Sequence, residues 1–207
     1  GASMGIHESQ SRIYENIFGR NINFWKAVYP KLQETFPENL KAVSLEDFYM
    51  IINDSKSSLI RIEADELTYP IHVLIRYELE KEIFSEDINI DELPKKWADK
   101  YEEYLGVRPN TFEEGILQDV HWSSGLFGYF SSYALGSAYA SQFYNSMIKE
   151  FDVEKELRKG SFKKINEYLR ENIHKYGKYK TPNEIIKDTT KEEFNPNYYI
   201  NYLREKY

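Results

Sequence analysis

Two neighbouring residues near the start of the chain, His7 and Glu8, could bind a metal ion. They open the string HESQS, which begins like the HExxH zinc motif but has Ser11 in place of the second histidine. That motif needs two imidazoles four residues apart on one helical face, so it is incomplete here, and it occurs nowhere else in the sequence. The residues alone are more typical of an exposed first turn of a helix.

Arg76 could bind a carboxylate, because a guanidinium can donate two parallel hydrogen bonds to one. It lies in the string IRYELE, with Glu80 four residues later and His72 four residues earlier. On a helix the same spacing allows a salt bridge between Arg76 and Glu80, worth about 0.3–0.5 kcal/mol at a surface. Spacing alone favours the salt bridge over the carboxylate site.

The string QDVHW places Gln118, Asp119, His121 and Trp122 in a stretch with very little charge. Residues 115–148 contain a single charged side chain, that of Asp119. Polar groups in apolar surroundings need partners, because burying them unpaired is costly. A structural hydrogen bond between histidine and carboxylate and a functional network are equally compatible with this pattern.

Tyr129 and Tyr133 follow one helical turn apart and could place two hydroxyl groups on one wall of a site. The chain has 18 tyrosines, however, so packing is the simpler explanation for this pair.

The composition excludes several classes of protein. The chain has 207 residues, no cysteine, four histidines and a net charge of −7. Disulfides, cysteine nucleophiles, iron–sulfur clusters and cysteine zinc sites are therefore absent, and the acidic charge argues against a nucleic-acid partner. No signal peptide is visible, and we expect a cytoplasmic protein. Because Gly1 is not an initiator residue, we expect that the chain was cut or expressed from a fusion.

The elements that must position these side chains are mainly helices, and we expect one helical unit over residues 1–207 with no internal repeat or linker. Apolar spacing and capping residues predict the helices. Their expected ranges are 7–18, 22–36, 44–52, 67–84, 94–105, 126–151, 161–176, 182–189 and 197–207. Alternation over residues 59–64 predicts one short β element.

The weakly charged stretch is expected to contain a buried turn and a long core helix. A membrane span is the alternative, but too many serines, glutamines and histidines interrupt it. Small residues at Gly128, Ser132, Gly136 and Ala140 recur every four positions. On a helix they would form a ridge that another helix can approach closely.

Three strings taken together are more specific than any single motif. They are GIHESQSR at 5–12, IRIEADELTYPIHVLIRYELEK at 60–81 and GILQDVHWSSGLFGYF at 115–130, followed by YALG at 133–136. In order and spacing, the chain resembles the carboxypeptidase Taq family of thermostable metallocarboxypeptidases. The resemblance covers essentially the whole chain but only the C-terminal part of a family member.

The resemblance implies a mainly helical, zincin-like fold with a deep substrate groove, usually in a homodimer without a nucleic-acid or membrane partner. It implies an enzyme that removes amino acids from the C-termini of peptides. It also implies a zinc ion, held by the two histidines of HExxH and a third ligand; cobalt is compatible with such a site.

Carried over by position, the resemblance makes Glu8 the third metal ligand and Arg76 the residue that binds the substrate carboxylate. Gln118, Asp119 and Trp122 would contribute to the substrate groove together with His121. His121 and Tyr129 are the catalytic candidates, Tyr129 as a hydrogen-bond partner of the substrate or the tetrahedral intermediate.

The departure from the family is the missing HExxH helix, which should precede Glu8. We therefore expect the 207 residues alone to bind no zinc and to be inactive, and to need the missing N-terminal part of the same protein. The alternative is a non-catalytic helical module that binds peptides or assembles with a separate N-terminal half.

Overall fold

A computed structural model describes residues 2–85 and 89–207. Gly1, on which the expectation about the start of the chain depends, lies outside the described residues. Where the sequence analysis expects one helical unit, the contacts divide the chain into two compact units. Unit 1 comprises Gly1–Asp54 and Leu135–Tyr207, and unit 2 comprises Ser55–Ala134. The predicted fold class is confirmed, because the described residues are mainly helical.

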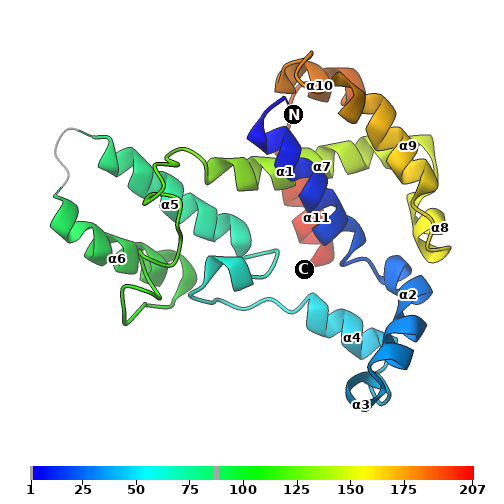
Figure 1. The fold of residues 1–207 in the computed structure, drawn as a ribbon, viewed down its shortest axis with the longest axis horizontal. Helices are drawn as coiled ribbons and strands as arrows, with labels where there is room; N and C mark the ends of the chain where they lie inside the picture. Colours follow the sequence, from blue (N-terminus) through cyan, green and yellow to red (C-terminus); the bar gives the residue numbers. More distant parts are fainter. Residues whose placement is uncertain (1, 86–88) are drawn as a thin grey trace. The chain divides into compact units, whose positions relative to one another are not determined.

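Unit 1 contains most of the helices in Figure 1. They are α1 (Met4–Arg12), a π-helix (Ile13–Phe18), α2 (Ile22–Thr35), α3 (Pro37–Leu40), α4 (Leu45–Ile52), α8 (Val153–Arg158), α9 (Lys163–Asn172), a 3₁₀ turn (His174–Tyr176), α10 (Pro182–Thr190) and α11 (Asn197–Lys206). Most of α7 (Ser131–Glu150) also belongs to this unit. The sequence analysis missed the short helices α3 and α8.

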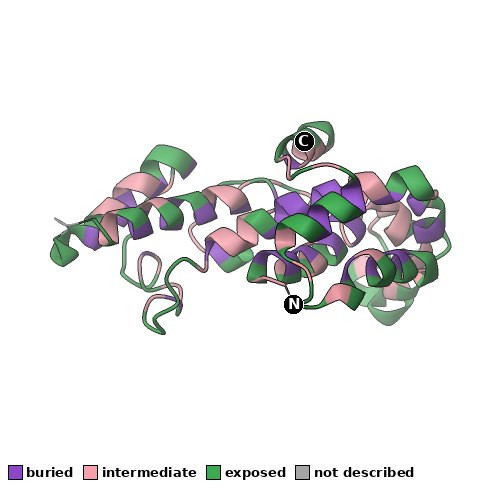
Figure 2. Ribbon diagram, turned by 90° about the horizontal axis from the view of Figure 1, so that it is seen from above, coloured by how far each residue is buried: buried purple, intermediate pink, exposed green. Residues whose placement is uncertain are grey.

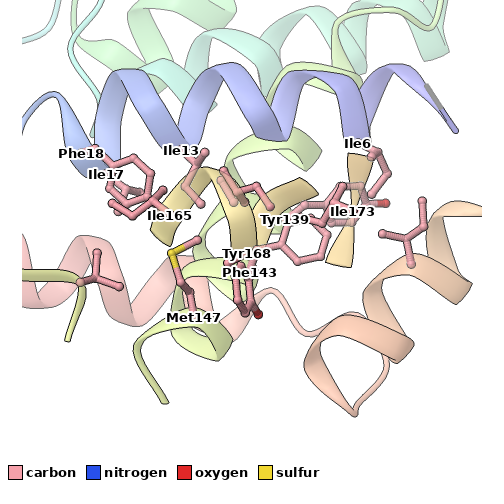
Figure 3. Close-up of a cluster of buried hydrophobic side chains, with 14 of the residues drawn as sticks. Ile6, Ile13, Ile17, Phe18, Tyr139, Phe143, Met147, Ile165, Tyr168 and Ile173 are labelled. Carbon is pink, nitrogen blue, oxygen red and sulfur yellow. The ribbon is translucent and has the colours of Figure 1, made fainter. Parts of the chain in front are cut away.

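Capping residues explain where several of these helices begin. The Ser44 hydroxyl accepts a hydrogen bond from the Asp47 amide, as predicted. At α10, Thr181 and Glu184 form a reciprocal capping box. The helices are buried on one side and exposed on the other, as Figure 2 shows. The buried sides meet in the apolar core of Figure 3, which includes Phe143 and Met147 of α7.

The packing of α1 on α7 depends on Gly136. A Cβ atom at this position would lie 2.6 Å from Cγ and 2.8 Å from Cβ of Glu8. Gly136 and Ala140 are buried as the predicted ridge requires. Gly128 is not part of the ridge, because it precedes α7 and has a φ of +76°, which a right-handed helix does not allow. This glycine explains why the helix expected from residue 126 begins at Ser131.

Unit 2 is built on α5 (Tyr69–Ile83) and α6 (Leu93–Leu105), which pack side by side (Figure 1). A 3₁₀ turn (Ile90–Glu92) leads into α6, and Gly106 ends it with a φ of +67°. Residues 107–130 then form a series of turns, with no regular helix or strand. This turn region contains the QDVHW string.

The β element expected over residues 59–64 is wrong. Arg61–Glu63 form a 3₁₀ turn, and the described part of the chain contains no strand. A strand needs a neighbouring strand for its backbone hydrogen bonds. Here the Arg61 amide donates instead to the Gln118 side chain at 2.9 Å, and the Glu63 amide donates to the Ile60 carbonyl.

None of the helices in residues 2–85 and 89–207 has the length and apolar character that crossing a bilayer requires.

Candidate functional site

A buried ion cluster brings together three charged side chains of unit 2. The Asp119 carboxylate lies 2.6 Å from Nη2 of Arg61 and 2.6 Å from Nη2 of Arg76. The three side chains are at most 6% exposed. We call this group the Arg61–Asp119–Arg76 cluster. Two cations face one anion within it, so the trio carries one positive charge in excess.

Arg76 uses its donors on four different groups. Nε donates to Asp119 at 2.6 Å, and Nη2 donates to Oε1 of Gln118 at 2.8 Å. Nη1 donates to the His72 carbonyl at 2.8 Å and to the Tyr101 hydroxyl at 3.0 Å. The arginine is completely buried. Its donors are therefore engaged within the protein rather than turned to a binding surface.

The salt bridge between Arg76 and Glu80, the simpler alternative in the sequence analysis, does not form. Glu80 instead accepts a hydrogen bond from Nε1 of Trp122 at 2.8 Å. Arg76 pairs with Asp119, which lies 43 residues later. Gln118, Asp119 and Trp122 of the QDVHW string are therefore anchored to α5.

Gln118 connects the two arginines through Oε1 and uses Nε2 for backbone carbonyls. Oε1 accepts from the Arg61 backbone as well as from Arg76, and Nε2 donates to the carbonyls of Leu59 (3.0 Å) and Glu114 (2.8 Å). Because every partner is fixed by the fold, the amide can adopt only one orientation. Gln118 therefore joins the 3₁₀ turn at Arg61 to the turn region of residues 107–130.

The two arginines determine the protonation of Asp119. Burial by itself would raise the pKa of this carboxyl, but hydrogen bonds and charge from Arg61 and Arg76 outweigh it and hold the pKa below its ordinary value. Asp119 is therefore ionised at neutral pH.

His121 lies beside the cluster and, unlike Asp119, is uncharged at neutral pH. Burial lowers the pKa of this imidazole, and the positive charge of Arg61 lowers it further. Nε2 lies 2.9 Å from the Tyr133 hydroxyl, and Nδ1 lies 3.9 Å from Asp119. Nδ1 has no hydrogen-bond partner within residues 2–85 and 89–207.

Aromatic rings surround His121. The ring centroid of Tyr129 lies 5.5 Å from that of His121 and 5.4 Å from that of Tyr133. The Phe130 ring is closer, at 4.3 Å. The structure therefore brings both sequence-predicted tyrosines to the histidine, while Trp122 lies against Phe130 at 6.1 Å.

Arg61 is the residue that the sequence analysis missed. Its side chain is almost fully buried, and Nη1 donates to the Tyr69 hydroxyl at 3.0 Å. The guanidinium carbon lies 5.1 Å from the Tyr133 ring centroid and 5.5 Å from that of Phe130. In the sequence it was one residue of the alternation over residues 59–64, to which we gave no functional role.

Glu8 lies in unit 1, on α1. Its carboxylate accepts hydrogen bonds from Nε of Arg12 at 2.9 Å and from the Ser11 hydroxyl at 3.0 Å. The described residues contain no group of three or more His, Cys, Asp or Glu side chains that could hold a metal ion. A catalytic zinc needs three protein ligands, so these residues do not complete a metal site.

Comparison with known proteins gives the family. The profile of the carboxypeptidase Taq (M32) metallopeptidases matches residues 1–207. The chain belongs to the M32 family. Carboxypeptidase 1 of Bacillus subtilis is 55% identical to it over 210 residues. Thermostable carboxypeptidase 1 of Thermus thermophilus is 42% identical over 206 residues.

The solved M32 structures share this fold. The carboxypeptidase of Pyrococcus furiosus superposes on the whole chain with a TM-score of 0.96 and 40% sequence identity. The match covers 41% of that structure. The Bacillus and Thermus relatives are likewise covered over 42% and 40% of their lengths, against 100% and 99% of this chain. The chain therefore spans about two fifths of the M32 proteins it matches.

Proposed function

We propose that this chain is the C-terminal portion of a zinc-dependent metallocarboxypeptidase, which releases C-terminal amino acids from peptides. The observation that carries the proposal is the excess positive charge of the Arg61–Asp119–Arg76 cluster. Two buried cations that share one anion are incompletely compensated, and the carboxylate of a peptide C-terminus would supply a second anion. Membership of the M32 family supports the same conclusion.

The geometry favours Arg61, rather than Arg76, as the group that meets the substrate carboxylate. Arg76 is completely buried, and each of its nitrogens is engaged by the protein. The nitrogens of Arg61 are engaged too, but by two groups rather than four, Asp119 and the Tyr69 hydroxyl. The Arg61 guanidinium also lies against the rings of Tyr133 and Phe130. Arg76, the candidate from the family resemblance, then holds Asp119 and Gln118 in place, and these two orient Arg61.

His121 and Tyr129 are the proposed catalytic residues on this side of the site. A neutral imidazole whose Nδ1 lacks a partner within the part of the chain described can form a hydrogen bond with a peptide group. Tyr129 lies next to it and can donate from its hydroxyl. Trp122, with Gln118 and Asp119, would form the wall of the substrate site.

Glu8 would supply one zinc ligand in the parent protein, with Arg12 and Ser11 orienting its carboxylate. When bound, zinc polarises the scissile carbonyl and activates water; cobalt would suit the same donors. The other two ligands and the general base would come from the part of the protein outside this chain. Residues 1–207 alone are expected to be inactive, and a homodimer and a cytoplasmic location remain predictions.

Binding of a peptide carboxylate can be tested without the metal. N-acetyl-trialanine and its C-terminal amide would be titrated into the 15N-labelled chain, with the Nε–H signals of the arginines as the readout. We expect the free acid to shift the Arg61 signal and the amide to shift it far less. Equal shifts with the acid and the amide would exclude this cluster as the carboxylate site.

The second candidate is a non-catalytic module that binds peptide C-termini or pairs with a separate N-terminal half. It is favoured by the absence of a complete metal site in residues 2–85 and 89–207. Co-expression with the upstream coding region, followed by a peptidase assay with zinc, separates the two candidates. Release of single C-terminal residues supports the enzyme, and binding of the free acid without release supports the module.

A further inference from the structure

Three buried side chains surround Arg76 in addition to its charged partner. They are His72 on α5 and Trp97 and Tyr101 on α6, all at most 1% exposed. The guanidinium carbon of Arg76 lies 4.5 Å from the Trp97 ring centroid, and Trp97 stacks on Tyr101 with centroids 5.3 Å apart. The proposed function gives no role to these residues.

The Tyr101 hydroxyl makes hydrogen bonds with both Arg76 and His72. Nη1 of Arg76 is 3.0 Å from this oxygen, and because a guanidinium can only donate, the oxygen accepts. Nδ1 of His72 lies 3.0 Å from the same oxygen. We take the hydroxyl proton to point to His72, in which case Nδ1 accepts it and the proton of the neutral ring is on Nε2.

The surroundings of His72 agree with a neutral ring. Burial and the charge of Arg76, with a smaller effect of Arg61, lower the pKa of this imidazole to about 4. The charges of Asp65 and Asp119 raise the pKa of His72, but by less than burial and the two arginines lower it. Protonation would place a third cation beside two arginines and would remove the acceptor that the Tyr101 hydroxyl uses.

Packing alone does not explain a histidine at this position. Nε2 of His72 has no hydrogen-bond partner among the residues whose structure is described. A buried polar nitrogen without a partner is unfavourable, and a leucine in the same space would avoid that cost. The ring nitrogen of His72 that does make a hydrogen bond is Nδ1, and its partner is the Tyr101 hydroxyl.

We propose that His72 and Tyr101 are positioning residues for the carboxylate-binding site. His72 holds the Tyr101 hydroxyl in one orientation, that oxygen fixes the Arg76 guanidinium, and Arg76 fixes Asp119. Asp119 in turn orients Arg61. This role rests on the proposed function, because it matters only if Arg61 receives a carboxylate.

The first measurement needs no substitution. Long-range 1H–15N spectra of the 207-residue chain report which nitrogen of His72 carries the proton. We expect a single tautomer with the proton on Nε2, unchanged between pH 8 and about pH 5.5. A proton on Nδ1, or a charged ring in this range, would overturn the proposed hydrogen-bond direction.

Three substitutions then test whether His72 acts through Tyr101. His72→Asn places an amide oxygen near the position of Nδ1 and keeps an acceptor, whereas His72→Leu and Tyr101→Phe break the link. We expect the Nε–H signal of Arg76 to stay protected from exchange in the asparagine variant and to lose protection in the other two. Tyr104→Phe is the matched control. Tyr104 lies on α6, as Tyr101 does, but its hydroxyl donates to Glu78 at 3.0 Å instead of contacting Arg76.

The same variants connect the inference to binding. If the wild-type chain binds N-acetyl-trialanine, His72→Leu and Tyr101→Phe should weaken that binding about tenfold, and His72→Asn should restore most of it. Equal loss in the asparagine and leucine variants would show that His72 only fills space. Failure of the wild type to bind would overturn the carboxylate site, whereas the tautomer and the Arg76 signal test the positioning itself.

Discussion

His72 should make the protein less stable as the pH falls from 7.5 to 5. The folded state lowers the pKa of this imidazole from 6.5 to about 4, first through burial and then through Arg76 and Arg61. In the unfolded chain the ring titrates near its ordinary value. Between these two pKa values the unfolded state binds more protons than the folded state, so acidification favours unfolding.

The expected size of this effect follows from the two pKa values. Their difference of about 2.5, at about 1.4 kcal/mol per pH unit, gives about 3 kcal/mol once the pH is below both. About 2 kcal/mol of this is lost between pH 7.5 and pH 5. Because the His72 side chain is completely buried, solvent does not screen the effect.

Urea unfolding followed by tryptophan fluorescence at pH 7.5 and pH 5 measures this loss. His72→Asn removes the titrating ring. Between pH 7.5 and pH 5 the free energy of unfolding should therefore fall in both proteins, but by about 2 kcal/mol less in this variant than in the wild type. His174→Asn is the control, since His174 is exposed and its replacement should change the pH dependence far less. The same pH dependence in wild type and His72→Asn would refute the argument that the fold keeps His72 neutral.

Three further outcomes are expected. Gly136→Leu should cost at least the ~1–3 kcal/mol typical of overpacking, because even a Cβ there would lie 2.6 Å from Glu8; an unchanged Tm would show that α1 can move away freely. Asp119→Asn should cost ~3–5 kcal/mol in urea unfolding, because it leaves two buried guanidiniums without an anion; a loss below about 1 kcal/mol would contradict this. Metal analysis after dialysis should find well under one zinc per chain, and stoichiometric zinc would show that Glu8 has ligands we have not identified.

Features set by local chemistry were predictable from the sequence. The cap at Ser44, the end of α6 at Gly106 and the start of α10 beside Pro182 all depend on residues within a few positions. The close approach at Gly136 was also predictable, because a small residue on a long apolar helix needs a neighbour. In each case one residue type determines the backbone or the space beside it.

The arrangement of the site could not be derived in the same way. Arg61 and Asp119 are 58 residues apart, and Arg76 and Asp119 are 43 apart. Helical spacing predicted Glu80 as the partner of Arg76, and the alternation of residues 59–64 predicted a strand around Arg61. Both local patterns gave way to a buried carboxylate, because a buried guanidinium needs an anion in contact with it, whereas a surface pair between neighbours on a helix contributes little.

The Arg61–Asp119–Arg76 cluster is hard to explain as a device for stability. Apolar residues of similar volume often serve a core as well as a buried ion trio or better, and within this trio two cations share one anion. The fold adds a second cost beside it, a buried histidine whose Nε2 has no partner in the described structure. The excess positive charge of the trio and the Nε2 of His72, unpartnered among the described residues, both lie next to Arg76. Such unfavourable features are expected where a fold forms a ligand-binding site. A carboxylate that bound at Arg61 would supply the missing anion.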